Sequence, residues 1–153
     1  WRNRRDAGAT ALLQRPIIEL SDSLLSKRFK KVRKQGRVFD TLSAEEKHQL
    51  RIDVKKLRYA TDFFSSLYGR ERVRGFTTEM QKLQDGLGYM NDVAVARDLV
   101  AHLVKTSSRN TAGPIARAGA LVLGWHSFGA EQATKTLADD VARLLACKRF
   151  WST

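Results

Sequence analysis

Residues 48–64, HQLRIDVKKLRYATDFF, place one histidine and three cations at helical spacing. His48, Arg51, Lys55 and Arg58 follow one another at steps of three, four and three. At about 100° of rotation per residue they fall within about 80° of one another, with Tyr59 beside them. Arg offers a planar fork of donors to phosphate oxygens, and Lys a mobile point charge. The pattern therefore indicates a face that could bind a polyanion.

The opposite side of the same segment is apolar, and its residues are Leu50, Val54, Leu57 and Phe64. One stripe is thus expected to pack in a core while the other is presented elsewhere. A charged stripe on a helix is most often solvated surface, and spacing alone leaves the two interpretations close. Like charges a few ångströms apart repel one another, so selection for stability alone would intersperse acids. Asp62 is the one acid on this face, and it follows the stripe.

A second basic face precedes the first along the chain, and it consists of Lys27, Lys30, Lys31 and Lys34. If the two helices lie side by side, both basic faces could bound one groove. The whole chain has 28 Lys and Arg against 16 Asp and Glu, a formal net charge of +12. That surplus favours partners such as nucleic acid, an anionic membrane or an inorganic phosphate polymer.

Four long helical segments account for nearly all of the 153 residues, which suit one domain. Ser43 followed by Glu46 predicts a capping box at the start of the second helix. Gly86 and Gly88 indicate a kink or a close helix contact in the third. The polar stretch 105–114 predicts a loop, with Pro114 in the first turn of the last helix. The expected segments are 9–39, 43–67, 70–104 and 114–147, an all-α antiparallel four-helix bundle over residues 1–153.

Catalytic signatures are absent from the sequence, which contains no Gly-rich phosphate loop, zinc-ligand spacing or nucleophile motif. We therefore expect a binding module with no enzyme activity, metal or cofactor. No apolar run approaches the roughly 20 residues that span a bilayer, so no membrane partner is expected. The lone Cys147 fits a reducing cytoplasm. The start, WRNRRDAG, suggests a piece of a longer chain.

Three segments together resemble one family, the CHAD domain, or conserved-histidine α-helical domain. The first segment is His48, Arg51 and Lys55 followed by Leu-Arg-Tyr and the Phe pair at 63–64. Downstream, LQDGLGYMNDVAVA (83–96) is similar to the family's leucine-glycine-asparagine-aspartate segment. GALVLGW (119–125) and the closing Phe-Trp pair (150–151) are similar to its end.

The resemblance implies two related four-helix bundles that face one another across a basic cavity. This chain carries the helix motif once and has about half the family's length, so it resembles the C-terminal half. The expected partners are then the missing N-terminal half or a second copy of the chain, and a CYTH triphosphatase domain in the parent protein. Family members bind inorganic polyphosphate and associate with polyphosphate granules in bacteria and archaea.

By resemblance, His48, Arg51, Lys55 and Arg58 line an anion site. Tyr59, Lys82 and the basic face of the first helix join the candidate set, while Asn91 and Asp92 orient basic side chains or form a helix–helix hydrogen bond. The rival interpretations are a nucleic-acid-binding bundle and a structural half-bundle that dimerises. Residues read as structural, in the core or as caps, are His102, His126, Trp125, Trp151 and Cys147.

Overall fold

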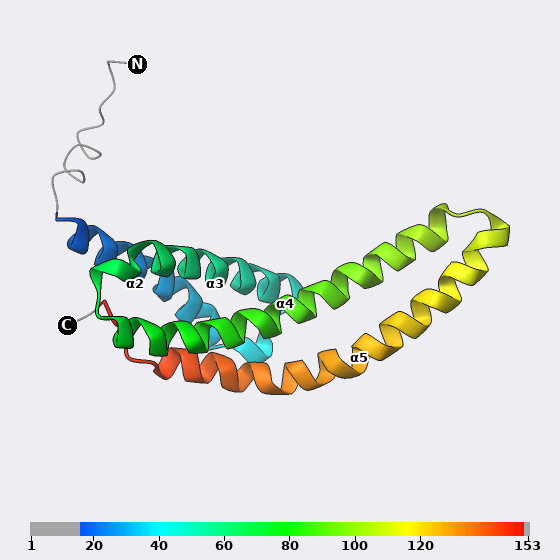
Figure 1. Cartoon of the computed structure of the whole chain (residues 1–153). Coiled ribbons are helices and arrows are strands. Elements are labelled where there is room, and N and C mark those ends of the chain that lie inside the picture. Colours follow the sequence, from blue (N-terminus) through cyan, green and yellow to red (C-terminus); the bar gives the residue numbers. More distant parts are fainter. Residues whose placement is uncertain (1–15, 152–153) are drawn as a thin grey trace, which may run out of the picture.

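The computed structural model describes residues 16–151 and is built from α-helices, with no strand in that range. The elements in chain order are α2 (Ile17–Gly36), the 3₁₀ turn η1 (Phe39–Thr41), α3 (Ala44–Phe64), the 3₁₀ turn η2 (Ser65–Leu67), α4 (Arg70–Thr106) and α5 (Arg109–Ala146). The predicted all-α helical bundle is confirmed (Figure 1). The first seven residues of the expected first helix, 9–15, lie outside the described range.

The start of α3 is the capping box that its sequence predicts. The Glu46 amide donates to Ser43 Oγ at 3.2 Å, and the Ser43 amide donates to Glu46 Oε2 at 2.8 Å. The hydrogen bond from the Ser43 amide is the main cause of the lowered pKa of the Glu46 carboxyl, and the Ser43 side chain lowers it further. The register of the basic stripe on α3 is therefore set by a local signal.

The predicted loop at 105–114 is wrong. α4 continues to Thr106 and α5 begins at Arg109, so the connection is only Ser107 and Ser108. Pro114 lies in the second turn of α5 rather than the first. Packing between α4 and α5 stabilises helix in this polar stretch, because tertiary contacts outweigh local propensity.

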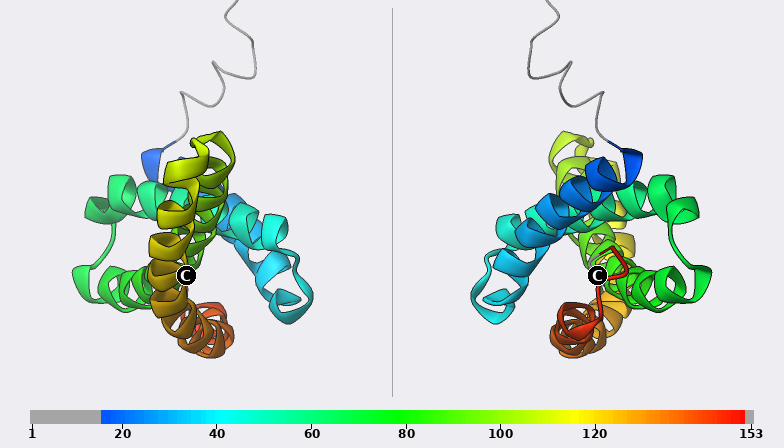
Figure 2. Two further views of the ribbon diagram at one scale, coloured as in Figure 1. Left: turned by 90° about the vertical axis from the view of Figure 1, so that its right-hand side faces the viewer. Right: turned by 90° about the vertical axis from the view of Figure 1, so that its left-hand side faces the viewer.

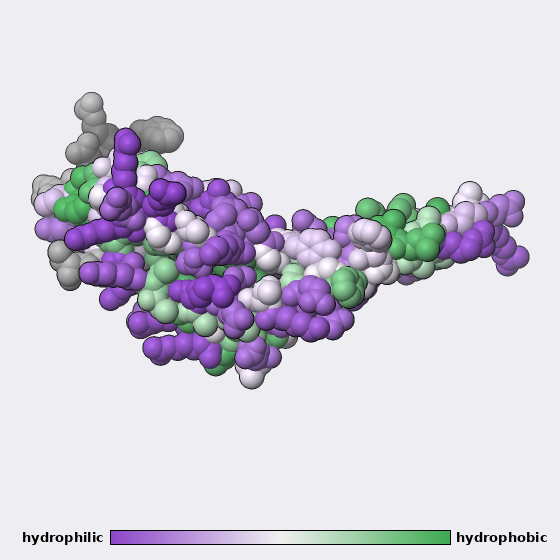
Figure 3. All heavy atoms as spheres, turned by 60° about the horizontal axis from the view of Figure 1, so that its bottom comes forward, coloured by the Kyte–Doolittle hydropathy of each residue, from purple (hydrophilic) through white to green (hydrophobic). Residues whose placement is uncertain are grey.

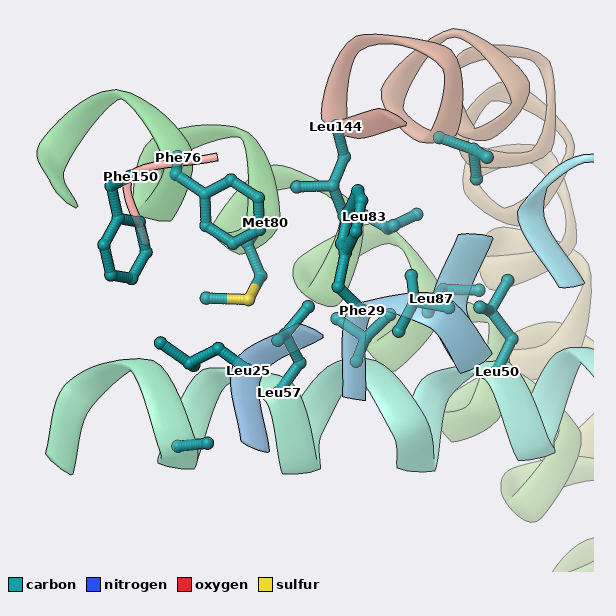
Figure 4. Close-up of a cluster of buried hydrophobic side chains, with 14 of the residues drawn as sticks. Leu25, Phe29, Leu50, Leu57, Phe76, Met80, Leu83, Leu87, Leu144 and Phe150 are labelled. Atoms are coloured by element: carbon teal, nitrogen blue, oxygen red, sulfur yellow. The ribbon is translucent and has the colours of Figure 1, made fainter. Parts of the chain in front are cut away.

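The hydrophobic core is formed by α2, α3, the first half of α4 and the last turns of α5 (Figure 4). Phe76 is its largest fully buried side chain and makes edge-to-face contacts with Phe29, Phe150 and Trp151. The Trp151 indole N–H donates to Ser26 Oγ at 3.0 Å. The chain end is therefore part of the core, as expected of Trp151.

α4 and α5 continue together beyond the ends of α2 and α3 as a long helical hairpin (Figure 1). Seen from its tip, the hairpin projects from the bundle toward the viewer (Figure 2, left). We call residues 94–136 the arm and the remainder of the described chain the bundle. Trp125, expected in the core or as a cap, lies on the arm and is 82% exposed, so that expectation is wrong.

The two glycines of α4 have different surroundings. A Cβ added to Gly86 would lie 2.8 Å from Leu137 of α5, so Gly86 permits the close helix contact that the sequence suggested. A Cβ on Gly88 would meet nothing within 4 Å. Gly88 instead lies beside the basic stripe of α3, where it lines a hollow.

Candidate functional site

The basic stripe of α3 is presented on the surface, as its spacing predicts. Leu50, Val54 and Leu57 are fully buried on the other side of the helix. His48 and Lys55 are exposed, while Arg51 and Arg58 are half-buried. We call His48, Arg51, Lys55 and Arg58 the α3 stripe. It is held rigidly, because the opposite face of the same helix is locked in the core.

The hollows beside the α3 stripe lie between α3 and α4. Arg51 and Lys55 share one hollow with Gln84 and Gly88 of α4. The same hollow contains two carboxylates, those of Asp85 and Asp92. The site is therefore cationic on its α3 side and acidic on its α4 side, which the sequence pattern did not predict.

His48 is joined to α4 by a hydrogen bond. Its Nδ1 lies 2.9 Å from Asn91 Oδ1, and because that amide oxygen can only accept, the His48 ring donates from Nδ1. On a ring that carries a second proton, Nε2 would donate to an anion. This contact is a helix–helix hydrogen bond that also orients His48, so the two possibilities that the sequence left open for Asn91 coincide.

Arg58 is positioned by contacts at both ends of its guanidinium. Nη1 donates to Gln84 Oε1 at 3.3 Å, and Nε lies 3.6 Å from Asp62 Oδ2 in an i,i+4 ion pair. Lys55 lies over the Tyr59 ring, with Nζ 5.8 Å from the ring centroid. Tyr59 is 60% exposed, so it lies on the surface next to the stripe rather than in the core.

The other predicted cations are separated from the stripe or already paired. Lys82 lines a hollow with Arg58, but its ammonium forms a 2.7 Å ion pair with Glu79. That hydrogen bond is the main cause of the lowered pKa of Glu79. The four α2 lysines (Lys27, Lys30, Lys31 and Lys34) are exposed, and none of them lines a hollow that contains α3 stripe residues in the described chain. A groove bounded by both basic faces stays a prediction.

Sequence reasoning missed Gln84 and Asp85, and it assigned Asp92 only an orienting role. Gln84, Gly88 and Asn91 follow one another at steps of four and three, which places them on one face of α4. Asp85 and Asp92 share the adjacent face at a step of seven. This periodicity is visible in the sequence, but it does not predict which helix lies opposite that face of α4.

The remaining residues of chemical interest lie apart from the stripe. The Tyr89 hydroxyl oxygen lies 3.2 Å from His126 Nδ1, so His126 has a structural contact. His102 is exposed. Burial raises the pKa of the Cys147 thiol, consistent with a packed side chain. Within residues 16–151 no group of three His, Cys, Asp or Glu side chains is arranged to hold a metal ion. None of the helices there is long and apolar enough to cross a membrane.

A comparison with protein families finds a matching model. The model of the CHAD domain matches residues 1–101, a range that contains α2, the whole α3 stripe and the α4 residues opposite it. No curated protein matches the chain. The matched range covers well over half of the sequence, and the chain belongs to the CHAD domain family.

Proposed function

We propose that this chain is a binding module for inorganic polyphosphate and that the α3 stripe is its contact surface. The observation that carries the proposal is a row of one histidine and three cations on a helix whose other face is locked in the core. Among these three cations, only Arg58 forms an ion pair with another described residue, Asp62. Arg51 and Lys55 therefore keep their charge for a ligand.

The dimensions of the stripe suit a linear polyanion. His48 and Arg58 are ten residues apart, which corresponds to about 15 Å along the helix axis. Successive phosphates of one chain would meet successive cations over that distance. Binding should release counterions and weaken steeply with salt, by analogy with nucleic acids.

The carboxylates of Asp85 and Asp92 restrict where the polyanion lies. A phosphate chain inside the hollow would be repelled by both carboxylates. We infer that the ligand runs along the exposed flank of α3, over His48 and Lys55. Asn91 holds His48 through Nδ1, so that Nε2 of a protonated ring would be the donor to a phosphate oxygen.

Membership of the CHAD family supports polyphosphate over other polyanions, because polyphosphate is the ligand that the resemblance to this family implies. Nucleic acid is the chief rival, because the same cations would contact its phosphates. Tyr59 and Phe63 are exposed one turn apart on α3, at one end of the stripe, so they offer bases two rings to stack on rather than a platform along its length. Binding without catalysis and location at cytoplasmic polyphosphate granules belong to the same proposal.

The test is calorimetric titration with long-chain polyphosphate and with duplex DNA at equal phosphate concentration, in about 150 mM salt. The stripe variant Arg51→Ala/Lys55→Ala/Arg58→Ala is compared with Lys27→Ala/Lys30→Ala/Lys34→Ala. Both remove three exposed or half-exposed cations, so they are matched in net charge. We expect the stripe variant to lose about 100-fold in affinity for polyphosphate and the α2 variant only a few-fold.

Equal losses in the two variants would mean that binding follows net charge alone, which contradicts a site on α3. Equal affinity for DNA and polyphosphate would contradict polyphosphate as the specific ligand. In cells, a fluorescent fusion of the chain should accumulate at polyphosphate granules. The stripe variant should stay diffuse.

A further inference from the structure

The arm exposes apolar side chains on faces that α4 and α5 do not use to contact each other. The two helices meet through Val100 against Gly119 and Tyr89 against Gly129. The exposed residues on the arm are Val95, Leu99 and Leu103 of α4 and Leu121, Val122, Trp125 and Phe128 of α5. Figure 3 shows hydrophobic residues gathered on the arm, whereas the bundle side of the same view is mostly hydrophilic.

This apolar surface is large for a chain of this size. Trp125 is 82% and Leu121 77% exposed. At roughly 150–250 Å² for a fully exposed large side chain, the seven residues offer roughly 800 Å². Stable protein interfaces bury about 800 Å² on each partner.

Charge is distributed unevenly along the arm. Residues 99–130 contain no Asp or Glu, and the cations of that stretch are Lys105, Arg109 and Arg117, close to the tip. At the base of the arm, Asp98 adjoins Arg97, and Glu131 forms a 3.0 Å ion pair with Lys135. The arm therefore has a basic tip, and a base where acids and cations balance.

We propose that two copies of this chain associate through their arms, side by side and antiparallel. A helical hairpin with an apolar face is half of a four-helix bundle, and a second hairpin supplies the missing half. The antiparallel arrangement keeps the two basic tips apart, whereas a parallel one would bring their like charges together. The contact is then the same on both copies, as two-fold symmetry requires.

The position of the apolar residues favours a second arm over a lipid surface. They lie along the shaft of the hairpin, whereas the tip, KTSSRNTAGP at 105–114, is polar. A hairpin that inserts into a bilayer would need apolar residues at its tip. A hairpin that packs lengthwise needs them along its shaft.

Sedimentation equilibrium of the 153-residue chain tests the proposal, over roughly 1–100 μM. We expect a dimer, with twice the 17.3-kDa chain mass, at the upper concentrations. The variant Leu121→Ser/Trp125→Ser should raise the dimer dissociation constant about 30-fold or more. The control Val38→Ser/Phe63→Ser removes two exposed apolar residues outside the arm, at 50% and 77% exposure, and should leave it unchanged. Circular dichroism establishes that each variant is folded.

Labels at the tip test the orientation. Ser108→Cys in a Cys147→Ser background accepts one spin label on each copy. Antiparallel arms separate the two tips by roughly 20 Å or more, given the rise of 1.5 Å per residue. Parallel arms would place the tips about 10 Å apart, the usual spacing of packed helices.

Three results would overturn the proposal. The first is a monomer at every concentration, and the second is a dimer that the arm variant does not weaken. The third is a pair of tips about 10 Å apart, which would show the opposite orientation. Flotation of the chain with phosphatidylserine vesicles, lost in the arm variant while no dimer forms, would assign the same surface to a membrane instead.

Discussion

The bundle and the arm are made of the same two long helices, yet only the bundle buries its apolar side chains. In the bundle, Phe76, Met80 and Leu83 of α4 are covered by α2, α3 and the end of α5. In the arm, Leu99 and Leu103 of the same helix are exposed. The difference teaches that helix formation and burial are separate here: pairing with α5 is enough to keep α4 helical, but two helices cannot enclose a core.

The largest expected difference between the two regions is in the free energy of unfolding when one aromatic ring is removed from each. Phe76→Ala should lower the free energy of unfolding by about 3–5 kcal/mol, because it leaves a cavity among three other rings. Trp125→Ala should change it by about 0.5 kcal/mol or less in dilute monomer, since this ring is mostly in water. Urea unfolding followed by circular dichroism measures both.

If Phe76→Ala fails to fold, Phe76→Leu keeps the comparison, with a smaller loss in the same direction. A loss for Trp125→Ala as large as that for Phe76 would mean that the arm is packed within the monomer. The distinction between the two regions would then be wrong.

Glycine substitutions give the next largest contrast. Gly86→Ala should destabilise the bundle by about 1–3 kcal/mol, because its Cβ would press on Leu137. Gly124→Ala in the arm meets nothing within 4 Å and should stabilise the helix by up to about 1 kcal/mol. The change in melting temperature has opposite signs for the two variants. The same sign for both would show that Leu137 yields to the added methyl group.

The alkaline limit of stability should depend on one tyrosine in the bundle. Partial burial and a 2.6 Å hydrogen bond to Asp22 raise the pKa of Tyr68 to about 12 from its ordinary value of 10. The neutral phenol is the form that the fold favours. Its contribution to stability is therefore complete below pH 10 and is lost as the pH rises toward 12.

Ultraviolet titration of the phenolate should show one late-ionising tyrosine in the wild-type chain. Tyr68→Phe should remove that step and flatten the loss of stability above pH 10. If the late step persists in Tyr68→Phe, another of the chain's tyrosines is responsible.

The smallest effect is expected where the two regions join. Asp85→Asn/Asp92→Asn removes two carboxylates that share a hollow with Arg51 and Lys55. Polyphosphate affinity should rise a few-fold, because two repulsive charges are lost and screening by solvent limits each to less than about 1 kcal/mol. Calorimetry at fixed salt measures the change. A fall in affinity would mean that these acids hold the cations in place.

Local signals explain what the sequence predicted correctly. The Ser43–Glu46 capping box and the apolar residues opposite the stripe lie within one helix, so their spacing determines both the start of α3 and its buried face. The close contact at Gly86 was indicated by a glycine that is costly in a helix and therefore needs a reason to be there. The position of each residue on its own helix could be predicted.

Which helix lies opposite another could not be predicted in the same way. The stripe borders α4, so Asp85 and Gln84 join its hollow. The prediction of a loop at 105–114 was wrong because packing between α4 and α5 outweighed the polar composition of this stretch and the presence of Pro114. Trp125 is a large apolar side chain of the kind usually buried in a core. Its exposure follows from the lengths of α2 and α3, which end before they could cover the arm.

The chain contains its own optical probe for each region. The Trp151 indole is buried and hydrogen-bonded to Ser26, and that of Trp125 is 82% exposed on the arm. An indole emits at longer wavelength in water than in an apolar interior, so the two rings should fluoresce at separate wavelengths. In a Trp1→Phe background, the red component reports what covers the arm while the blue component reports whether the bundle is intact.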